Sequence, residues 1–494
     1  MKINFYLAVL IANTCLLLGS TSFGQSWNPT TGDFDGTGDF SATEDSDPWS
    51  GPQLFARNGG ELTYVGDAEH NGRTRVEGAS SVFVDGSFNH TNAFQGFAVT
   101  GNDGQGGLSS LTIVDVANSN VNSADFLLDS TELNLNSVIS ESSAFVRDGA
   151  RLNVLQDIQV GGRTAIESGA QVVVGGAFNQ SNAFQAFAVT GNDGQGGVSS
   201  LTIGDVANSN VASADFLLDS SELNLNSVTS ESSAFVRDGA RLNVLQDIQV
   251  GGRTAIESGA QVVVGGNFDQ ANTNQDFSVS GADFFGNRSS FEVGGEADIE
   301  VRAFTSSGRT GFSGEVKTAM DAIFFNGATI APGTSVGELN FDTTSIATED
   351  HALEINSGVV YEWELGASGN DVINVDGDLI LRDFWTLDLL VLADALTDID
   401  ASDRFNLFTY TGQVSAFTES SGQLTRVTID DSLLDANRLD ATDVGIFDDG
   451  NGTIFLTGLI SVAVPEPSAV AILSLAFVCL STRRKRAKHA ANQR

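Results

Sequence analysis

A block of 90 residues occurs twice in succession in this chain of 494 residues. The first copy is Phe88–Ala177 and the second is Phe178–Asn267, and the two differ at only nine positions. A weaker third copy begins at Phe268, and a half copy, Arg57–Phe88, comes before the first. An active site seldom requires two neighbouring copies, so near-identical tandem units predict a scaffold that has been lengthened by duplication.

Each block contains a shorter period of 19 to 20 residues. A unit consists of a short apolar start, a tight polar turn such as Asp148-Gly149, and a run of alternating apolar residues. Alternation with a period of two predicts strands with one face inward. Stacked strand–turn–strand units predict an all-β fold, a parallel β-solenoid, and the short spacing favours it over tandem β-sandwiches. Two inward rows are expected to align: Leu133, Leu152 and Val172, and Leu135, Val154 and Val174.

The repeats predict a solenoid over residues 54–314. About twelve coils, each advancing about 4.8 Å, would form a rod roughly 55–60 Å long. The phrases DGARLNV (148–154) and SGAQVVVGG (168–176) resemble the passenger segments of autotransporters and related bacterial adhesins. An acidic segment, 25–53, comes before the solenoid, and a β-rich domain, 315–460, follows it.

Acidic residues dominate the chain, with 63 acidic against 24 basic residues and a net charge of −39. This charge argues against nucleic acid and anionic membrane surfaces as partners. The two cysteines, Cys15 and Cys479, lie in the terminal apolar segments. We therefore expect the body of the protein to be stabilised by its core and its hydrogen-bond ladders rather than by disulfides.

The N-terminus predicts export. Met1–Gly24 has one positive charge at Lys2, an apolar run from Phe5 to Leu18, and small residues before the expected cleavage site. These features predict a secretory signal peptide that is cleaved between Gly24 and Gln25.

The C-terminus, 461–494, has three parts: Pro465-Glu466-Pro467, the apolar run Ala469–Leu480, and the basic cluster Arg483-Arg484-Lys485-Arg486. The apolar run would span roughly 18 Å as a helix, short of the roughly 30 Å core of a bilayer, which predicts a short, transient inner-membrane anchor. This arrangement resembles the PEP-CTERM sorting signal. The resemblance implies recognition by an exosortase, removal of the tail, and delivery to the cell surface or an exopolysaccharide matrix.

The segment between the solenoid and the tail carries a further resemblance. Ala331–Phe341 and Tyr361–Leu381 are similar to the end module of autotransporter-like and PEP-CTERM proteins. More strands are expected at 385–392, 404–410, 424–429 and 444–458. The module implies a β cap that covers the open end of the solenoid, which would otherwise be an aggregation-prone edge.

Two segments have the composition of cation loops. The first, Asp33–Glu44, matches the six oxygen-bearing positions of a twelve-residue EF-hand loop and has Gly38 at the sharp turn. It departs from that motif in two ways: Thr37 replaces the usual Asp or Asn, and no amphipathic helix flanks the loop. The second is the Gly-rich stretch 100–107, repeated at 190–197, for which a flexible bulge is the simpler interpretation. The predicted calcium ligands are Asp33, Asp35, Thr37, Asp39, Ser41 and Glu44.

Catalytic motifs are weak in this sequence. His90 becomes Gln180 in the second copy, so the repeat does not require a histidine there. Glu362 and Glu364 share one face of an expected strand, as a glycosidase pair would, but the sequence shows no sugar-binding cleft, and solvated surface charges are the favoured interpretation. The arginines of the blocks do not by themselves define a lyase site. We therefore expect a non-enzymatic, secreted structural or adhesin-like protein. The alternatives are a polysaccharide-degrading enzyme on a β-helix and a calcium-dependent carbohydrate-binding module.

Overall fold

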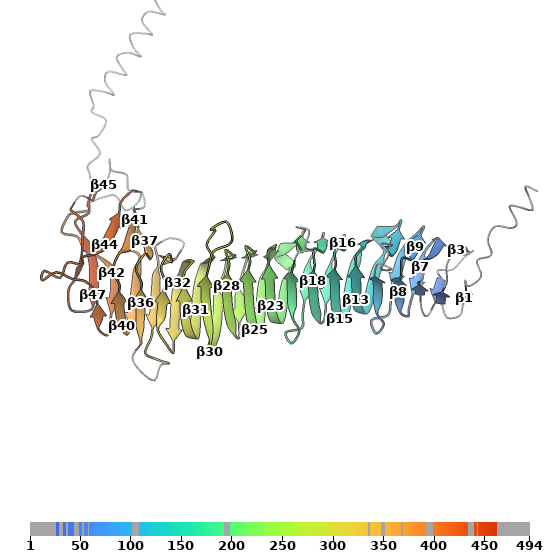
Figure 1. Ribbon diagram of the computed structural model, residues 1–494, viewed down its shortest axis with the longest axis horizontal. Helices are drawn as coiled ribbons and strands as arrows, with labels where there is room; N and C mark the ends of the chain where they lie inside the picture. The colour runs from blue at the N-terminus through green and yellow to red at the C-terminus, as the bar shows by residue number, and fades with distance from the viewer. Residues whose placement is uncertain are drawn as a thin grey trace, which may run out of the picture.

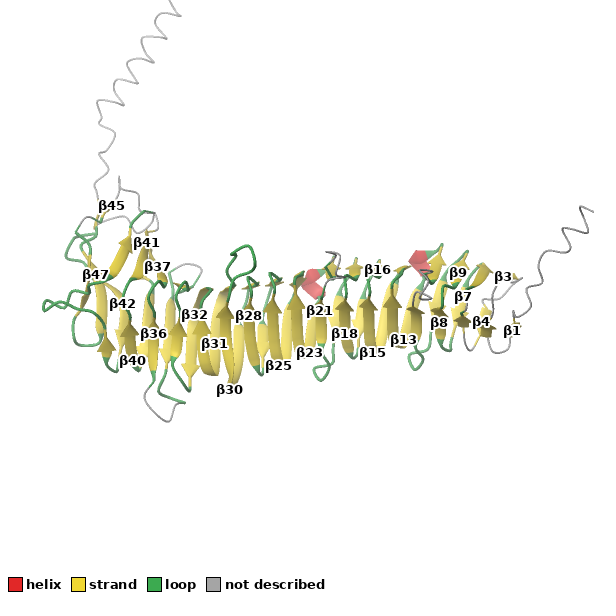
Figure 2. Ribbon diagram, viewed as in Figure 1, coloured by secondary structure: helices red, strands yellow, loops and turns green. Residues whose placement is uncertain are grey.

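The computed structural model describes residues 54–461, apart from residue 58, the short segments 101–107, 192–197, 334–335, 347–350, 367–368, 392–398 and 433–438, and residue 442. It also describes the backbone of four strands before residue 54. The described residues form a long rod of stacked strands (Figure 1). Strands account for nearly all of its regular structure, and the two helical turns are the short 3₁₀ segments η1 (Val116–Asn118) and η2 (Val206–Asn208) (Figure 2).

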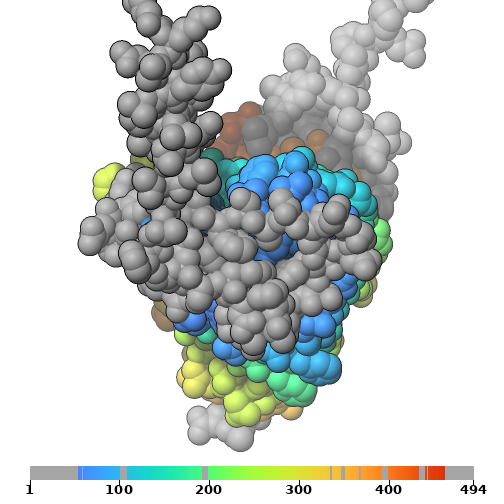
Figure 3. Space-filling model, turned by 90° about the vertical axis from the view of Figure 1, so that its right-hand side faces the viewer, coloured from blue at the N-terminus to red at the C-terminus, as the bar shows by residue number. Residues whose placement is uncertain are grey.

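Each coil of the rod contributes a strand segment to three faces, which we number in chain order. Neighbouring coils pair in parallel on each face, and on face two the pairing passes from Phe97 through Phe126, Ala144 and Thr164 to Phe187. The successive steps are 29, 18, 20 and 23 residues, so four coils make up one 90-residue block. The stacked parallel coils agree with the predicted solenoid. Seen along the rod from the N-terminal side, they lie behind one another (Figure 3).

Face one begins near the N-terminus and continues beyond the repeats. Long strands bend at the corners and so serve two faces or, in the case of β31, all three. The strands with segments on face one are β4 (Trp49–Gly51), β7 (Ala68–His70), β10 (Phe88–His90), β13 (Asn120–Asp129), β15 (Ser137–Arg147), β17 (Ile158–Val160), β20 (Phe178–Gln180), β23 (Asn210–Asp219), β25 (Ser227–Arg237), β27 (Ile248–Val250), β30 (Phe268–Ser280), β31 (Ser290–Ser306), β32 (Arg309–Thr318), β35 (Glu338–Asp342), β39 (Val372–Asp376) and β42 (Phe405–Tyr410).

Face two shares β13, β15, β23, β25, β30 and β31 with face one. Its remaining strands are β5 (Leu54–Ala56), β8 (Thr74–Glu77), β11 (Phe97–Thr100), β18 (Arg163–Glu167), β21 (Phe187–Thr190), β28 (Arg253–Glu257), β33 (Ala322–Phe324), β36 (Ala352–Ile355), β40 (Asp378–Leu381) and β43 (Val414–Ser415).

Face three shares β31 and β32 with the other faces. Its parallel ladder is broken between β12 and β14 and again between β22 and β24, at the same place in each block. Its remaining strands are β3 (Gly38–Thr43), β6 (Gly60–Val65), β9 (Ser81–Val84), β12 (Ser110–Ile113), β14 (Glu132–Leu135), β16 (Arg151–Val154), β19 (Gln171–Val174), β22 (Ser200–Ile203), β24 (Glu222–Leu225), β26 (Arg241–Val244), β29 (Gln261–Val264), β34 (Thr329–Ala331), β37 (Val360–Gly366), β41 (Trp385–Val391) and β44 (Val427–Asp430).

The two predicted inward rows are confirmed on face three. Leu133 pairs with Leu152 and Leu152 with Val172, while the row from Leu135 passes through Val154 to Val174. All six side chains are buried. Twelve strand segments lie on this face from Gly60 to Phe312, which matches the predicted number of coils in the repeat region.

On face two the pairing differs by one residue from the sequence alignment. Phe126 pairs with Ala144, whereas the 19-residue spacing that aligns Leu133 with Leu152 would align Phe126 with Phe145. The turn 148–150 is one residue longer than the turn 130–131, so the register shifts by one between the two faces. Phe145 therefore points outward, where the Arg163 guanidinium lies 5.5 Å from its ring centre.

Phenylalanine stacks run through the interior. Phe97 and Phe126 stack with ring centres 5.3 Å apart, and their copies Phe187 and Phe216 stack at 5.2 Å. A fully buried phenylalanine contributes roughly 1.5–3 kcal/mol relative to an exposed one, so a ring repeated on successive coils stabilises the rod along its length.

Parallel pairing continues past residue 314 into the segment for which a β-rich cap is expected. β32 pairs with β35, β35 with β39 and β39 with β42, all in parallel. Antiparallel pairs appear at the two ends. The remaining strands are β1 (Ser26–Asn28) and β2 (Asp33–Asp35) at one end, and β38 (Gly369–Asn370), β45 (Leu439–Asp440), β46 (Gly445–Asp448), β47 (Thr453–Thr457) and β48 (Ile460–Ser461) at the other.

The β46–β47 hairpin lies against the last strand of face one. β47 pairs antiparallel with β42, so the hairpin occupies the edge of that strand that faces away from β39. Ile446, Ile454 and Leu456 of the hairpin are buried and extend the apolar interior. An exposed strand edge is thereby covered at this end of face one.

Candidate functional site

The predicted calcium loop is divided between two strands. Asp33 and Asp35 lie on β2, which pairs with β5 of face two, and Asp39 and Ser41 lie on β3, which pairs with β6 of face three. Thr37, Glu44 and the side chains of the whole loop lie outside the described residues. Calcium binding there stays a prediction. Among the residues that the structure does describe, three or more His, Cys, Asp or Glu side chains nowhere gather in a way that could hold a metal ion.

Both terminal signals also lie outside the described residues. These are the signal peptide 1–24, the Pro465-Glu466-Pro467 motif and the basic cluster 483–486. The Gly-rich loops 101–107 and 192–197 lie outside them as well. Within the described ranges, no helix has the length and apolarity to cross a membrane.

His70 and His90 lie inside the rod rather than at its surface. Burial lowers the pKa of His70 to about 3, and the neighbouring His90 adds to that effect. Burial also lowers the pKa of His90, although its bond to a backbone carbonyl opposes the shift. Both rings pack against phenylalanines: His70 against Phe88 and His90 against Phe97.

The carboxylate pair of β37 points outward, as the alternation predicts. Glu362 and Glu364 are half-buried, and Glu362 forms an ion pair with Arg309, which also bonds Glu292 at 3.2 Å. Burial raises the pKa of Glu364, and Glu362 raises it further. Because Glu362 is engaged by an arginine, the geometry supports a surface ion-pair network more than an acid–base pair.

Four of the six block arginines considered for a lyase site have acidic partners. Arg147 lies 3.4 Å from Asp129, and its copy Arg237 forms a bidentate pair with Asp219. Arg163 lies 3.7 Å from Glu167 on the same strand, and the copy of this pair is conserved in the second block. These ion pairs engage four of the six arginines that a lyase site could use, and the other two, Arg151 and Arg241, are exposed on face three.

Face one carries a hollow that the sequence patterns do not predict. Its volume is about 360 Å³, and its lining is mostly polar: Ile139, Ser140, Glu141, Gln159, Val160, Gly161, Asn179 and Ser181. These residues come from β15, β17 and β20 and from the corners that follow these strands. Amide, hydroxyl and carboxylate groups therefore converge on one concave surface.

Beside this hollow, the corner between faces one and two forms a projecting turn. The turn occurs twice, at 91–96 and at 181–186, and carries Phe94 or Phe184 at its tip. These rings are 89% and 85% exposed, which is unusual for phenylalanine. Figure 1 shows the two turns as loops on the same edge of the rod, one between β8 and β13 and the other between β18 and β23.

The same side-chain hydrogen bond forms in both turns. The Asn92 side-chain oxygen accepts a bond from the Phe94 N–H at 2.9 Å, and Asn182 does the same for Phe184. The Asn92 side-chain amide also donates to the carbonyl of Asn71 on the preceding coil at 2.5 Å. Asn is the residue type that forms such side-chain turns, so these positions have a local structural cause.

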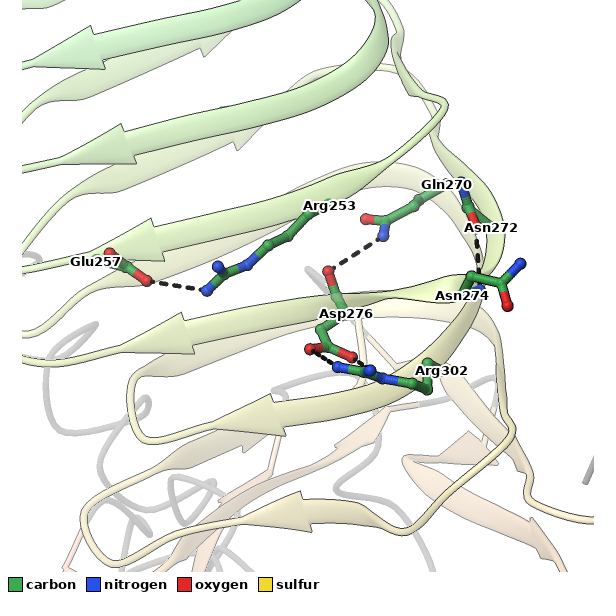
Figure 4. A network of polar contacts seen from close by, with 7 residues as sticks. All are labelled: Arg253, Glu257, Gln270, Asn272, Asn274, Asp276 and Arg302. Atoms are coloured by element: carbon green, nitrogen blue, oxygen red, sulfur yellow. Dashed lines mark hydrogen bonds and ion pairs between the residues drawn. The ribbon is translucent and has the colours of Figure 1, made fainter.

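In the third copy the equivalent residues, 271–276, lie within the bent strand β30, at an irregularity of its pairing with β31, and include no phenylalanine (Figure 4). Asn274 stands in place of the ring, and its N–H still donates to the Asn272 side chain at 3.1 Å. Asp276 of this copy forms a bidentate ion pair with Arg302, at 2.9 and 2.6 Å. The fold therefore accepts a polar residue at the tip.

Known proteins do not supply a family for this chain: no family model and no curated protein matches it.

Proposed function

We propose that this protein is a secreted, rod-shaped spacer of the cell surface or exopolysaccharide matrix, with an adhesive role. One observation carries the proposal. Both 90-residue copies form the same four coils in the same register, and the ladder passes from one copy to the next without a change in pairing. Duplication on this plan adds about 19 Å of length per block, at one strand spacing per coil.

The terminal segments support an extracellular location. We propose that the signal peptide directs export and that an exosortase recognises the Pro465-Glu466-Pro467 motif. The apolar run 469–480 and the basic cluster 483–486 would hold the precursor in the inner membrane until the tail is removed. The strongly negative charge supports a hydrated body that stays apart from anionic surfaces.

A truncation tests the sorting part of the proposal. Removal of Ser468–Arg494 should abolish membrane retention of the precursor and change the distribution of the protein between membrane, surface and medium. Cell fractionation and the intact mass of the surface form measure both effects. The full chain should lose mass at the motif, and a Lys488→Ala chain, changed beyond the basic cluster, should be processed normally. A full chain whose surface form keeps the mass of the whole tail, or a truncated chain with the same distribution as the full chain, would contradict the proposal.

An enzyme on the same fold is the main rival class. The paired arginines and the ion-paired Glu362 support the structural role over a lyase or glycosidase. Incubation of the purified protein with neutral and acidic polysaccharides should leave their chain length unchanged. Release of reducing ends or of unsaturated products above a heat-denatured control would favour the enzyme.

A further inference from the structure

The exposed phenylalanines of the two projecting turns are not required by the fold. Asn274 occupies the same position in the third copy and keeps the same turn hydrogen bond. Phe94 and Phe184 are almost fully exposed, so they gain none of the stabilisation that burial gives to an aromatic ring. Two equivalent exposed rings that the fold can do without are free to make contacts outside it.

The turns also hold the rings ready for contact. In each turn the N–H of the third residue after the asparagine donates back to its carbonyl, from Gln95 to Asn92 and from Gln185 to Asn182. The next coil is tied in as well, since the Ala124 N–H donates to the Gln95 carbonyl at 2.9 Å. A ring on such a bonded turn loses little conformational freedom on binding a ligand.

A pair of glycines lowers the rod surface next to the second turn. A Cβ atom at Gly161 would lie 2.4 Å from the Glu141 carbonyl oxygen, and one at Gly162 would lie 1.4 Å from that of Ser142. The coils stack so closely at this corner that only glycine fits. The hollow of about 360 Å³ includes Gly161 in its lining, and Ser181 of the turn that carries Phe184 forms one side of it.

The lining of the hollow indicates which kind of ligand fits. Gln159, Asn179 and Ser181 offer amide and hydroxyl groups that pair with hydroxyls, and Glu141 offers an acceptor. Its lining contains no lysine, arginine or histidine, and the whole chain carries a net charge of −39. An anionic polymer would be repelled, whereas a neutral, hydroxyl-rich polymer would not. The slightly positive C–H groups of a sugar ring suit the negative face of an aromatic ring.

The spacing of the turns favours a long ligand. Phe94 and Phe184 are equivalent residues of the two blocks, four coils apart, so they lie about 19 Å apart along one edge of the rod. An extended chain lying along that edge can contact both rings at once. Two linked contacts bind more tightly than one because the second is made at high effective concentration.

We propose that this edge is a binding site for a neutral polysaccharide, with Phe94 and Phe184 as stacking platforms and the hollow lined by Gln159, Asn179 and Ser181 as a polar subsite. The inference goes beyond the spacer proposal. Its failure would leave that proposal standing, because the length of the rod does not depend on either phenylalanine.

Affinity electrophoresis of the full chain in gels that contain a soluble neutral β-glucan tests the site. The full chain should be retarded in proportion to the glucan concentration and should not be retarded by alginate, which is anionic. Phe94→Asn/Phe184→Asn, which copies the turn of the third repeat, should weaken binding by about tenfold or more, and each single variant by less. Phe284→Asn is the matched control, because Phe284 is 97% exposed on the corner between faces two and three.

Three results would overturn the proposal. The first is a full chain that the glucan does not retard. The second is a double variant with an unchanged thermal midpoint that binds as tightly as the original chain. The third is self-association without glucan that the double variant abolishes, measured by light scattering, since the rings would then serve contacts between copies of the rod. A Gln159→Ala variant separates the subsite from the platforms and should weaken glucan binding with both rings intact.

Discussion

A single inward-facing residue shows how the fold uses the differences between copies. His90 donates from Nδ1 to the Asn122 carbonyl oxygen at 2.8 Å. Gln180 makes the corresponding bond to the Ala212 carbonyl at 3.4 Å and a second bond to Gln185. Either side chain therefore satisfies a backbone carbonyl at the corner, which explains why the repeat does not require a histidine.

His90→Gln should make the protein more resistant to mild acid. The pKa of His90 in the fold is lower than in the unfolded chain, because burial disfavours the charged ring. The unfolded chain therefore binds more protons below its ordinary pKa of about 6.5, and stability that is complete above that pH is lost as the pH falls. His70 adds to the same loss. The thermal midpoint of His90→Gln should equal that of the original chain at pH 8 and exceed it at pH 5.

The reciprocal variant is the control for this prediction. Gln180→His places a histidine in the second copy, where it should introduce acid sensitivity at an interior position that has none. Equal pH dependence for all three chains would show that the buried histidine does not limit stability. The sequence indicated that His90 is dispensable, but its burial depends on the pairing of β10 with β13, which joins residues 31 apart.

At the scale of the element, Asp371 fastens the end of β37 to the coil before it. Its carboxylate accepts bonds from the Gly337 N–H at 2.7 Å and from the Glu364 N–H at 2.9 Å, and its carbonyl accepts the Trp363 indole N–H at 2.9 Å. The side chain is 1% exposed. Burial raises its pKa to about 7 although the two N–H bonds favour the charged form.

The effect of Asp371→Asn on stability should depend on pH, with the larger loss of stability near pH 5. Near pH 5 the variant should be less stable by about 1–3 kcal/mol, because an amide can accept only one of the two N–H bonds. The folded pKa of about 7 exceeds the ordinary 3.8, so this residue's contribution is present at low pH and is lost as the pH rises through 7. That loss amounts to roughly 4 kcal/mol at most and is absent from the variant.

Urea denaturation at pH 5 and pH 8 measures this difference directly. The gap between the two chains should narrow, close or reverse at pH 8. Asp148→Asn is a suitable control, because that residue is exposed in the turn 148–150. A constant gap at both pH values would mean that Asp371 is ionised in the fold throughout the range.

The elements themselves were largely predictable and the surface between them was not. Alternation gave the inward rows from Leu133 and Leu135, because burial imposes a period of two on each strand. The one-residue shift between faces two and three was missed, because it depends on turn length rather than on alternation. The hollow beside Gly161 was also missed, since its shape arises from the stacking of corners 20 residues apart.

For the whole molecule, the repeat predicted both the parallel stacking and the number of coils between residues 60 and 312. It did not predict that parallel pairing would continue through β35, β39 and β42, because the sequence period fades there while the pairing does not. The hydrogen-bond ladder tolerates coils of unequal length, since the corners absorb the extra residues. Stability of such a stack is close to a sum over neighbouring coils.

Deletion of the second block, Phe178–Asn267, should therefore shorten the rod without unfolding it. The new junction joins Ala177 to Phe268 in place of Asn267. Ala177 and Asn267 already make equivalent bonds: their N–H groups donate to Asp157 and Asp247, and their carbonyls accept from the N–H groups of Ile158 and Ile248. Small-angle scattering should show a maximum dimension smaller by about 19 Å, with a thermal midpoint close to that of the original chain.

A second deletion, which does not remove a whole number of coils, tests whether the rod tolerates any shortening or only the loss of whole coils. Removal of Phe178–Glu257 takes out ten residues fewer, but it joins Ala177 to the turn at Ser258 and leaves that coil without strands on faces one and two. This variant should lose cooperative unfolding or aggregate, because its coil leaves two ladders unpaired inside the rod. If both deletions folded equally well, length would not be set by whole coils, and the spacer proposal would lose its physical basis.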